Sequence, residues 1–306
     1  MSFSSNNKRR FSLVQVDVFT SVPLQGNQLA VFTDARGLSD AEMQALAREM
    51  NFSETTFILP RDAAAERERG VRVRIFTVNE ELPFAGHPTL GTAMVLRNGD
   101  LHDDGKHGQD ELALDLNVGK IPVRFSTHEN LPFGMMTQRD PDFGQTHTRE
   151  DVARAVGLAV DDISADVPIQ TVSTGNAFIM VPLRSLSVLQ HLSPTWSNMQ
   201  SFLEKSDGKF FYFIAREAVN PEARLQTRMI FYNGEDPATG SAAGPCAAWA
   251  VKHGVVPPDQ QFLMEQGLEM KRRSRIFFSA GRQGDKIVNV QVGGHAVEVV
   301  RGEVFL

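Results

Sequence analysis

Two segments of the chain carry the same chemical pattern, in which an acidic residue and a proline lead to a glycine and then to small apolar residues. They are residues 81–93 and 235–247, and both read Glu-x-Pro-x-x-Gly. The small apolar run predicts a helix after each glycine. Helix starts present free backbone N–H groups and partial positive charge, and glycine lets a ligand approach the backbone closely. If the two turns face one site, that site suits an anionic substrate.

Glu54 is the candidate acid–base group. It follows Asn51-Phe52-Ser53 and enters the apolar strand-like run 55–59 without a basic residue nearby. Desolvation at such a position raises the pKa of a carboxyl group toward neutrality, which suits a group that accepts and returns a proton. The alternative is a structural carboxylate at a strand edge that accepts backbone hydrogen bonds.

Other polar candidates lie at the repeated turns. His87 and Ser241 directly follow the two glycines, and Asp236 precedes Pro237 in the second turn. They could contact a substrate, or His87 and Ser241 could satisfy backbone donors at helix starts while Asp236 is an ordinary turn residue. Gly86 and Gly240 either admit a ligand to the backbone or simply form tight turns.

Signatures of several common enzyme classes are absent from the sequence. There is no His-Glu-x-x-His, Cys-x-x-Cys, Gly-x-Gly-x-x-Gly, phosphate-binding loop or Gly-x-Ser-x-Gly. His102, Asp103, Asp104 and His107 suggest metal ligands, but a polar surface loop over 100–111 is the favoured interpretation because ligands need a rigid frame. We therefore expect no metal and no cofactor.

The elements that must position these residues are themselves duplicated. Residues 26–32 resemble 175–181, the strand 55–59 aligns with 209–213, and each half ends in an alternating strand pair, around 115–125 and 288–300. A helix over 39–50, with a Ser39–Glu42 capping box, has its counterpart in a helix with Ser193 at the N-cap and Pro194 in the first position. A repeat of this length indicates a duplicated domain.

Two helices are expected at the centres of the domains. Residues 87–98 and 241–253 are apolar on almost every side, with charge only in the last turn, and Gly99 and Gly254 follow them. A helix that is apolar all round is buried, so each domain is expected to wrap a strand-rich layer around it. Further predicted elements are strands over 14–19 and 71–76, a junction near 128–148 and a helix over 148–157.

The composition argues against a nucleic-acid-binding, disulfide-bonded or membrane-spanning protein. The chain has 306 residues, 42% of them hydrophobic, a net charge of -6 and a single cysteine. The negative charge argues against a general affinity for nucleic acid. One cysteine excludes an intramolecular disulfide. With no apolar signal segment and no apolar run of 18 residues, we expect a cytoplasmic protein without a membrane span.

Four segments carry a resemblance to a known family. Residues 26–32, 51–57, 85–93 and 234–245 look like signature segments of the phenazine-biosynthesis PhzF-like family, and the likeness runs over about residues 11–306. It implies the diaminopimelate epimerase-like α+β fold, with a mixed sheet around a central helix in each of two domains and the active site between them. We place these domains at 11–128 and 129–295. The strand 296–306 either completes the first domain or supplies an edge for a homodimer.

The resemblance also implies roles for individual residues. Glu54 would shuttle the proton. The other residues implied at the active site are His87, Asp236 and Ser241 beside it, the backbone of Gly86 and Gly240, and the substrate-binding positions Thr239, Asn27 and Asn176. Related racemases use two cysteines, and this chain has Ala85 and Thr239 at those positions, with Cys246 inside the helix. Two-cysteine racemisation is therefore not expected.

The resemblance implies a cofactor-independent isomerase that moves a proton within a small carboxylated molecule, such as trans-2,3-dihydro-3-hydroxyanthranilate. Two alternatives stay open from the sequence. One is a binding protein that has lost turnover. The other is a dehydratase, in which the same glutamate would serve while a hydroxyl group leaves.

Overall fold

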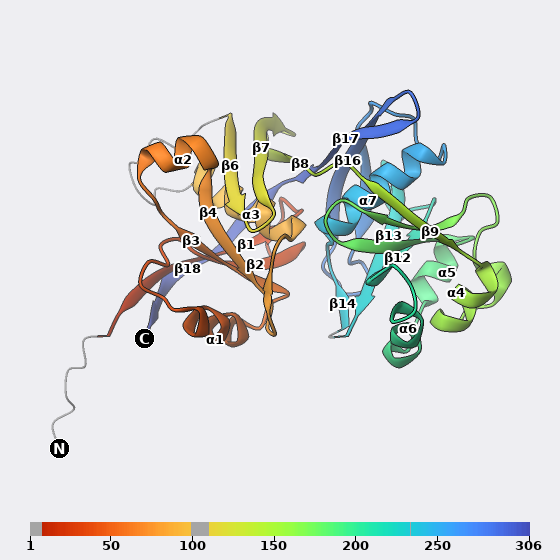
Figure 1. Ribbon diagram of the computed structural model, residues 1–306, viewed down its shortest axis with the longest axis horizontal. Coiled ribbons are helices and arrows are strands. Elements are labelled where there is room, and N and C mark those ends of the chain that lie inside the picture. Colours follow the sequence, from red (N-terminus) through yellow and green to blue (C-terminus); the bar gives the residue numbers. More distant parts are fainter. Residues whose placement is uncertain (1–7, 99–109, 233) are drawn as a thin grey trace, which may run out of the picture.

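The computed structural model describes residues 8–98, 110–232 and 234–306, which form two lobes side by side (Figure 1). The predicted surface loop with His102, Asp103, Asp104 and His107, and the predicted helix-terminal Gly99, lie outside the described residues. The N-terminal half of the chain forms one lobe, and most of the C-terminal half forms the other. The final strand returns to the first lobe.

The helices are α1 Asp40–Met50, α2 Ala63–Arg69, α3 Gly86–Asn98, α4 Arg149–Val156, α5 Leu186–His191, α6 Trp196–Leu203 and α7 Gly240–Lys252, with a short 3-10 turn at Val160–Asp162. The strands of the first half are β1 Arg10–Val18, β2 Asn27–Phe32, β3 Glu54–Leu59, β4 Val71–Phe76, β5 Glu81–Leu82, β6 Glu111–Leu116, β7 Gly119–His128 and β8 Leu131–Thr137. Those of the second half are β9 Asp142–His147, β10 Ile169–Ser173, β11 Ala177–Pro182, β12 Phe210–Ala215, β13 Ala223–Phe231, β14 Gly234–Asp236, β15 Phe262–Gln266, β16 Ser274–Gln283, β17 Lys286–Gly294 and β18 Ala296–Phe305.

Strand pairing follows the same order in both lobes. In the first, β1 pairs with β2, β2 runs parallel to β3, β4 runs parallel to β6, and β6, β7 and β8 follow as antiparallel neighbours. In the second, β10, β11, β12, β13, β15, β16 and β17 repeat this succession. The division at residues 128 and 129 stays a prediction. In this common topology β8 corresponds to β17 and therefore belongs with the first lobe.

The chain crosses between the lobes twice. Strand β8 pairs with β7 in the first lobe and with β17 in the second, so it links the two sheets. After β17 the chain returns, and β18 pairs along the whole of β1, from Arg10 opposite Phe305 to Val18 opposite Ala296. The C-terminal strand thus completes the sheet of the first lobe. This was the first of the two roles considered for residues 296–306.

The central helices α3 and α7 are buried over most of their length. Small residues allow this, because α7 reads Gly-Ser-Ala-Ala-Gly-Pro-Cys-Ala-Ala and sheet strands can pack closely against it. Strands β1, β2, β6 and β8 contact α3, whereas β10, β11, β16 and β17 contact α7. The prediction of a mixed sheet around a central helix is confirmed, and the fold is α+β. Both helices begin at the boundary between the lobes.

Several local predictions are confirmed. The capping box of α1 is present, with the Ser39 side chain accepting from the Glu42 backbone N–H and the Glu42 carboxylate accepting from the Ser39 N–H. Strand β4 spans residues 71–76 as predicted. Helix α4 begins after Thr148 as N-cap and ends at Gly157 in the left-handed conformation. Strand β1 begins at Arg10, earlier than predicted, because it pairs with β18 along its first residues.

Two predictions are wrong. Ser193 is not an N-cap and Pro194 is not helical, since α6 begins at Trp196 after Thr195. A residue before proline is pushed toward extended backbone, and these residues connect α5 to α6 in that form. Residues 288–300 do contain two strands, but β17 and β18 do not pair with each other, because β18 leaves for the other lobe.

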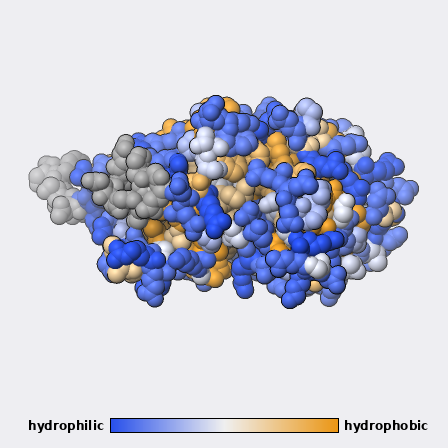
Figure 2. All heavy atoms as spheres, turned by 90° about the horizontal axis from the view of Figure 1, so that it is seen from above, coloured by the Kyte–Doolittle hydropathy of each residue, from blue (hydrophilic) through white to orange (hydrophobic). Residues whose placement is uncertain are grey.

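Within the described residues, no helix is long and apolar enough to cross a membrane. Figure 2 shows a face dominated by hydrophilic residues, with hydrophobic atoms visible between them toward its middle.

Candidate active site

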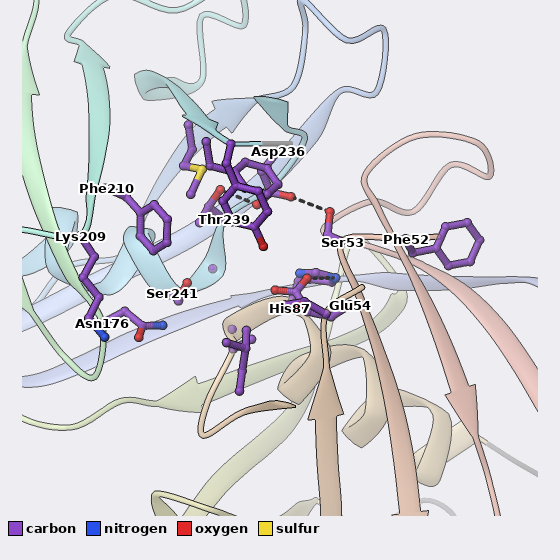
Figure 3. Close-up of a pocket in the computed structure, with 18 of the residues that line it drawn as sticks. Phe52, Ser53, Glu54, His87, Asn176, Lys209, Phe210, Asp236, Thr239 and Ser241 are labelled. Carbon is purple, nitrogen blue, oxygen red and sulfur yellow. Dashed lines mark hydrogen bonds and ion pairs between the residues drawn. The ribbon is translucent and has the colours of Figure 1, made fainter. Parts of the chain in front are cut away.

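The starts of α3 and α7 meet at the boundary between the lobes and form one wall of a cavity of about 540 Å³. The two repeated turns of the sequence therefore do face one site. Residues from both lobes line it, and Figure 3 shows Glu54 and His87 opposite Asp236, Thr239 and Ser241. The predicted residues that line the cavity are Glu54, Gly86, His87, Asn176, Asp236, Thr239, Gly240 and Ser241.

Glu54 is the first residue of β3 and projects into this cavity. Its side chain is 15% exposed, but Oε2 is buried and has no hydrogen-bond partner among the described residues. Burial raises the pKa of the Glu54 carboxyl well above its usual value, and the negative charge of Asp236 raises it further. A carboxyl group with a raised pKa and a free oxygen at a cavity wall can both accept and donate a proton.

His87 is the nearest partner of Glu54. Its Nε2 lies 3.5 Å from Glu54 Oε2, and the imidazole is 4% exposed. Burial lowers the pKa of His87 to about 3, against a smaller opposite effect of a hydrogen bond to the backbone of Gln28. His87 is therefore neutral at physiological pH, and it acts on a neighbouring group through hydrogen bonding without a positive charge.

Asp236, from β14 of the second lobe, is held by three side chains. Asn27 Nδ2 donates to Oδ1 at 2.8 Å, Ser53 Oγ donates to the same oxygen at 3.1 Å, and Thr239 Oγ1 donates to Oδ2 at 2.6 Å. Burial raises the pKa of Asp236 to about 6, and these hydrogen bonds keep the pKa from rising further. Because Asn27 and Ser53 belong to the first lobe, the carboxylate also joins the two halves of the site.

Asn27 lies behind the cavity wall. It is 2% exposed and is not among the cavity-lining residues. Its amide nitrogen also lies 2.9 Å from the carbonyl oxygen of Ala238 and 3.2 Å from Nδ1 of His87. Asn27 thus connects the imidazole to the carboxylate of the opposite lobe, which is a positioning role. Asn176, in contrast, reaches the cavity itself.

Gln266 is a buried residue of the site that the sequence did not indicate. Its Nε2 donates to the Asp236 carbonyl oxygen at 2.7 Å and to Thr239 Oγ1 at 2.9 Å, while its Oε1 accepts from the Thr239 N–H at 3.2 Å and from Tyr212 at 3.0 Å. These bonds fix the second turn just before α7. A glutamine at the end of β15 carries no motif, so only the fold reveals this role.

Lys209 was also not singled out as a site residue. Among the described residues that line the cavity, it is the one lysine or arginine, and it lies beside Asn176 (Figure 3). The cavity also has an aromatic character, and Phe210 lies beside Lys209 in Figure 3. The aromatic residues of the lining are Phe52, Phe178, Phe210, Phe231 and Tyr232. The cavity therefore combines a cation and two helix starts with apolar faces that suit a planar ring.

Cys246 does not take part in the site. It is fully buried in α7, outside the cavity lining, and burial raises the pKa of its thiol. Ala85 and Thr239, which precede the two glycines, both line the cavity. The positions at which the related racemases have cysteines therefore face the site but carry no thiol here.

Comparison with known proteins places the chain in a family. Residues 16–302 match the family described as phenazine biosynthesis-like protein. The chain is 37% identical to an uncharacterized isomerase of Mesorhizobium japonicum, over 95% of this chain and 97% of that protein. It is 33% identical to the trans-2,3-dihydro-3-hydroxyanthranilate isomerase of Pseudomonas aeruginosa, over 96% of this chain and 99% of that enzyme.

A solved structure agrees with this assignment. The PhzF-family phenazine biosynthesis protein of Bacillus anthracis superposes with a TM-score of 0.86 at 27% identity, covering 97% of this chain and 100% of that chain. Sequence and fold thus lead to the same relatives over nearly the full length of both. The chain belongs to the phenazine biosynthesis-like PhzF family and is an enzyme of the isomerase class.

Proposed function

We propose that this isomerase moves a proton within a small cyclic carboxylate and that Glu54 carries the proton. One observation supports this above all. A buried carboxyl oxygen without a hydrogen-bond partner faces a cavity, 3.5 Å from a neutral imidazole, and burial raises the pKa of that carboxyl. A structural carboxylate would be expected to have its buried oxygens paired.

The proposed reaction needs one acid–base group. The Glu54 carboxylate removes a proton from a ring carbon, and the electron pair is delocalised over the conjugated system. The carboxyl group then returns the proton to another carbon, so that atoms and charge balance without an oxidant. Because burial raises the pKa of Glu54, the protonated form is easier to reach, which lets one group perform both steps. His87, neutral and next to Glu54, hydrogen-bonds to the group that carries the transient charge.

We expect the substrate carboxylate to bind at the wall formed by the two helix starts. We assign it to the N–H groups at the starts of α3 and α7, at Gly86 and Gly240, with Ser241, Lys209 and Asn176 as side-chain partners. The aromatic lining accommodates the ring. The Pseudomonas aeruginosa relative suggests trans-2,3-dihydro-3-hydroxyanthranilate or a similar molecule.

Other expectations from the sequence stay proposals. The reaction as written uses no cofactor, and the partner is a small carboxylated molecule. A homodimer would use surface not engaged within the chain, and the outer edge of β18 is one such surface because β18 pairs only with β1 among the described strands.

The test is proton NMR in D₂O with trans-2,3-dihydro-3-hydroxyanthranilate, comparing the wild type with Glu54→Gln. The control is Glu80→Gln, which changes an exposed carboxylate lining the same cavity. We expect an isomerised product that contains deuterium with the wild type and the control, and none with Glu54→Gln. A product that has lost its hydroxyl group would indicate a dehydratase. Unchanged turnover in Glu54→Gln would reject the proposed role of Glu54.

A further inference from the structure

A second group of side chains that could do chemistry lies away from the cavity. His128 ends β7, Glu129 follows it in the turn to β8, and His295 separates β17 from β18. Each offers one possible metal-ligating atom, and these three atoms lie within 4.8 Å of one another. None of the three residues lines the active-site cavity. They occupy the region in which β8 and the β17–β18 junction connect the two lobes (Figure 1).

A hydrogen bond to the backbone determines which nitrogen of His295 carries its lone pair. His295 Nδ1 lies 2.8 Å from the carbonyl oxygen of Pro132, which can only accept, so Nδ1 carries the hydrogen. In the neutral ring, Nε2 of His295 then carries the lone pair. This nitrogen lies 3.4 Å from His128 Nδ1. A backbone carbonyl that holds the far nitrogen of a histidine is the usual support for a histidine that binds metal.

The spacing of the two nitrogens suits one metal ion. Two nitrogen ligands at about 2.0–2.1 Å from a tetrahedral zinc ion lie about 3.3–3.4 Å apart. In the structure His128 Nδ1 and His295 Nε2 lie 3.4 Å apart, at hydrogen-bonding distance. An ion could lie between them if His128 carried its hydrogen on Nε2, which would leave a lone pair on each of the two facing nitrogens.

Glu129 can supply the third ligand. It and Asn130 both have positive φ, at 52° and 62°, in the two-residue turn between β7 and β8, which directs the backbone back toward His128. Its carboxylate accepts two hydrogen bonds from Arg275, both at 2.9 Å. Arg275 also lies 3.7 Å from Glu222. The guanidinium thus competes with a metal ion for Glu129, and it has a second carboxylate to pair with when Glu129 is taken.

Solvent reaches this cluster. Glu129 and Arg275 line a wide groove on the surface of the described residues, and the Glu129 side chain is 46% exposed. Phe133 and Phe277 pack against His128 from the other side, with ring centroids 5.2 and 4.8 Å away. Apolar neighbours therefore hold the His128 imidazole in place, His295 is buried, and Glu129 forms the solvent-exposed side of the cluster.

We propose that His128, Glu129 and His295 bind a divalent transition metal ion of the zinc type at the junction of the two lobes. Two histidines and one carboxylate are a donor set that such ions accept, with water in the remaining position. The bound ion would link the β7–β8 turn, which leads into the strand that joins the two sheets, to the β17–β18 junction, where the chain returns to the first lobe. Its role is to tie the lobes together, independent of the proton transfer at Glu54.

The test uses metal binding alone and needs no substrate. Untagged full-length protein is stripped with a chelator and titrated calorimetrically with Zn²⁺, and Co²⁺ is followed by its visible absorption. We expect one ion per chain, and a loss of affinity of at least about tenfold in His128→Gln and His295→Gln. The control is His191→Gln on α5, whose exposed side chain bonds only to its own helix at Ser187. It should bind Zn²⁺ as the wild type does.

A fourth variant separates the metal site from a simple imidazole pair. Arg275→Gln removes the competitor for Glu129, so Zn²⁺ affinity should rise severalfold. If the wild type binds no Zn²⁺, or if His128→Gln and His295→Gln bind it unchanged, the proposal is overturned and the histidines are a structural hydrogen-bonded pair. An unchanged affinity in Arg275→Gln would remove Glu129 from the ligand set. Because His128 is only half-buried, its variant remains informative if His295→Gln fails to fold.

Discussion

Gly86 and Gly240 lie against each other where α3 and α7 begin. A Cβ atom built on Gly86 would lie 2.3 Å from the carbonyl carbon of Gly240 and 2.4 Å from the nitrogen of Ser241. The two copies of the repeated turn therefore meet backbone to backbone, which only glycine allows at this distance. This contact brings both helix starts to one cavity, so the glycines serve the geometry of the site as well as the turns.

Gly86→Ala is expected to destabilise the protein strongly. The new methyl group would meet backbone atoms of the other lobe, which cannot move aside as a side chain can. We expect the free energy of unfolding to fall by about 3 kcal/mol or more, and activity to fall with it because the helix starts separate. Chemical denaturation measures the effect. The control Gly302→Ala, in β18, places its methyl group in open space and should change stability by less than about 0.5 kcal/mol.

Glu54→Gln is expected to make the protein more stable at neutral pH while removing activity. The pKa of Glu54 is raised in the folded state, so on raising the pH the unfolded chain loses this proton first. Ionisation in the unfolded chain therefore lowers stability as pH rises above about 4.5, up to the folded-state pKa. The side chain of glutamine does not ionise, so the variant does not lose this stability. Its advantage in melting temperature should be largest at pH 8 and shrink toward pH 4.5.

Glu80→Gln is the control for that comparison, because this carboxylate lines the same cavity but is exposed to solvent. It should not gain melting temperature relative to the wild type. If Glu54→Gln loses melting temperature relative to the wild type at pH 8, then Glu54 contributes favourable interactions as a charged group, contrary to the burial described here.

The central helices and the catalytic candidates were predictable from the sequence because their signals are local. A helix of small apolar residues with its one charge in the last turn, such as α7, has to be buried, and the repeated glycines mark where it begins. The neighbours of Glu54 in sequence are apolar, so the direction of its pKa shift follows from residues 55–59 alone. These features depend on short-range patterns, which the sequence contains.

Other features depend on contacts between distant segments. Gln266 holds Asp236 and Thr239 from 27 to 30 positions away, and nothing in β15 marks it. The pairing of β18 with β1 spans nearly the whole chain, and an alternating strand pattern does not name its partner. The same limitation explains the error at 288–300, in which two consecutive strands join different lobes.

Lys209→Met is expected to weaken substrate binding with a small effect on turnover. Lys209 is the one cation among the described cavity-lining residues and lies apart from Glu54, beside Asn176 (Figure 3). Loss of its charge should raise KM for a carboxylated substrate by about tenfold, with kcat changed by less than about threefold. Steady-state kinetics measure both. Lys205→Met, which removes a lysine from a different surface groove, should change neither. A fall in kcat alone would place Lys209 in the chemical step.

Thr239→Val is expected to move the acidic limb of the pH–rate profile upward. The Thr239 hydroxyl donates to Asp236 Oδ2 at 2.6 Å, and this hydrogen bond is the largest of the effects that lower the pKa of Asp236, which burial raises to about 6. A hydrogen bond to a charged group contributes about 1.5–3 kcal/mol, and one pKa unit corresponds to about 1.4 kcal/mol. Its loss should therefore raise the pKa of Asp236 by about one unit.

If the reaction needs Asp236 as a carboxylate, the acidic limb of kcat/KM shifts by the same amount, and activity recovers at higher pH. Valine keeps the shape of threonine, so the cavity wall is preserved. The matched control is Thr55→Val. Thr55 is also buried, but its hydroxyl has no hydrogen-bond partner and it lies next to Glu54 in the chain. Its profile should coincide with that of the wild type. If Thr239→Val lowers activity equally at every pH, Asp236 does not set the acidic limb, and the hydroxyl acts by positioning alone.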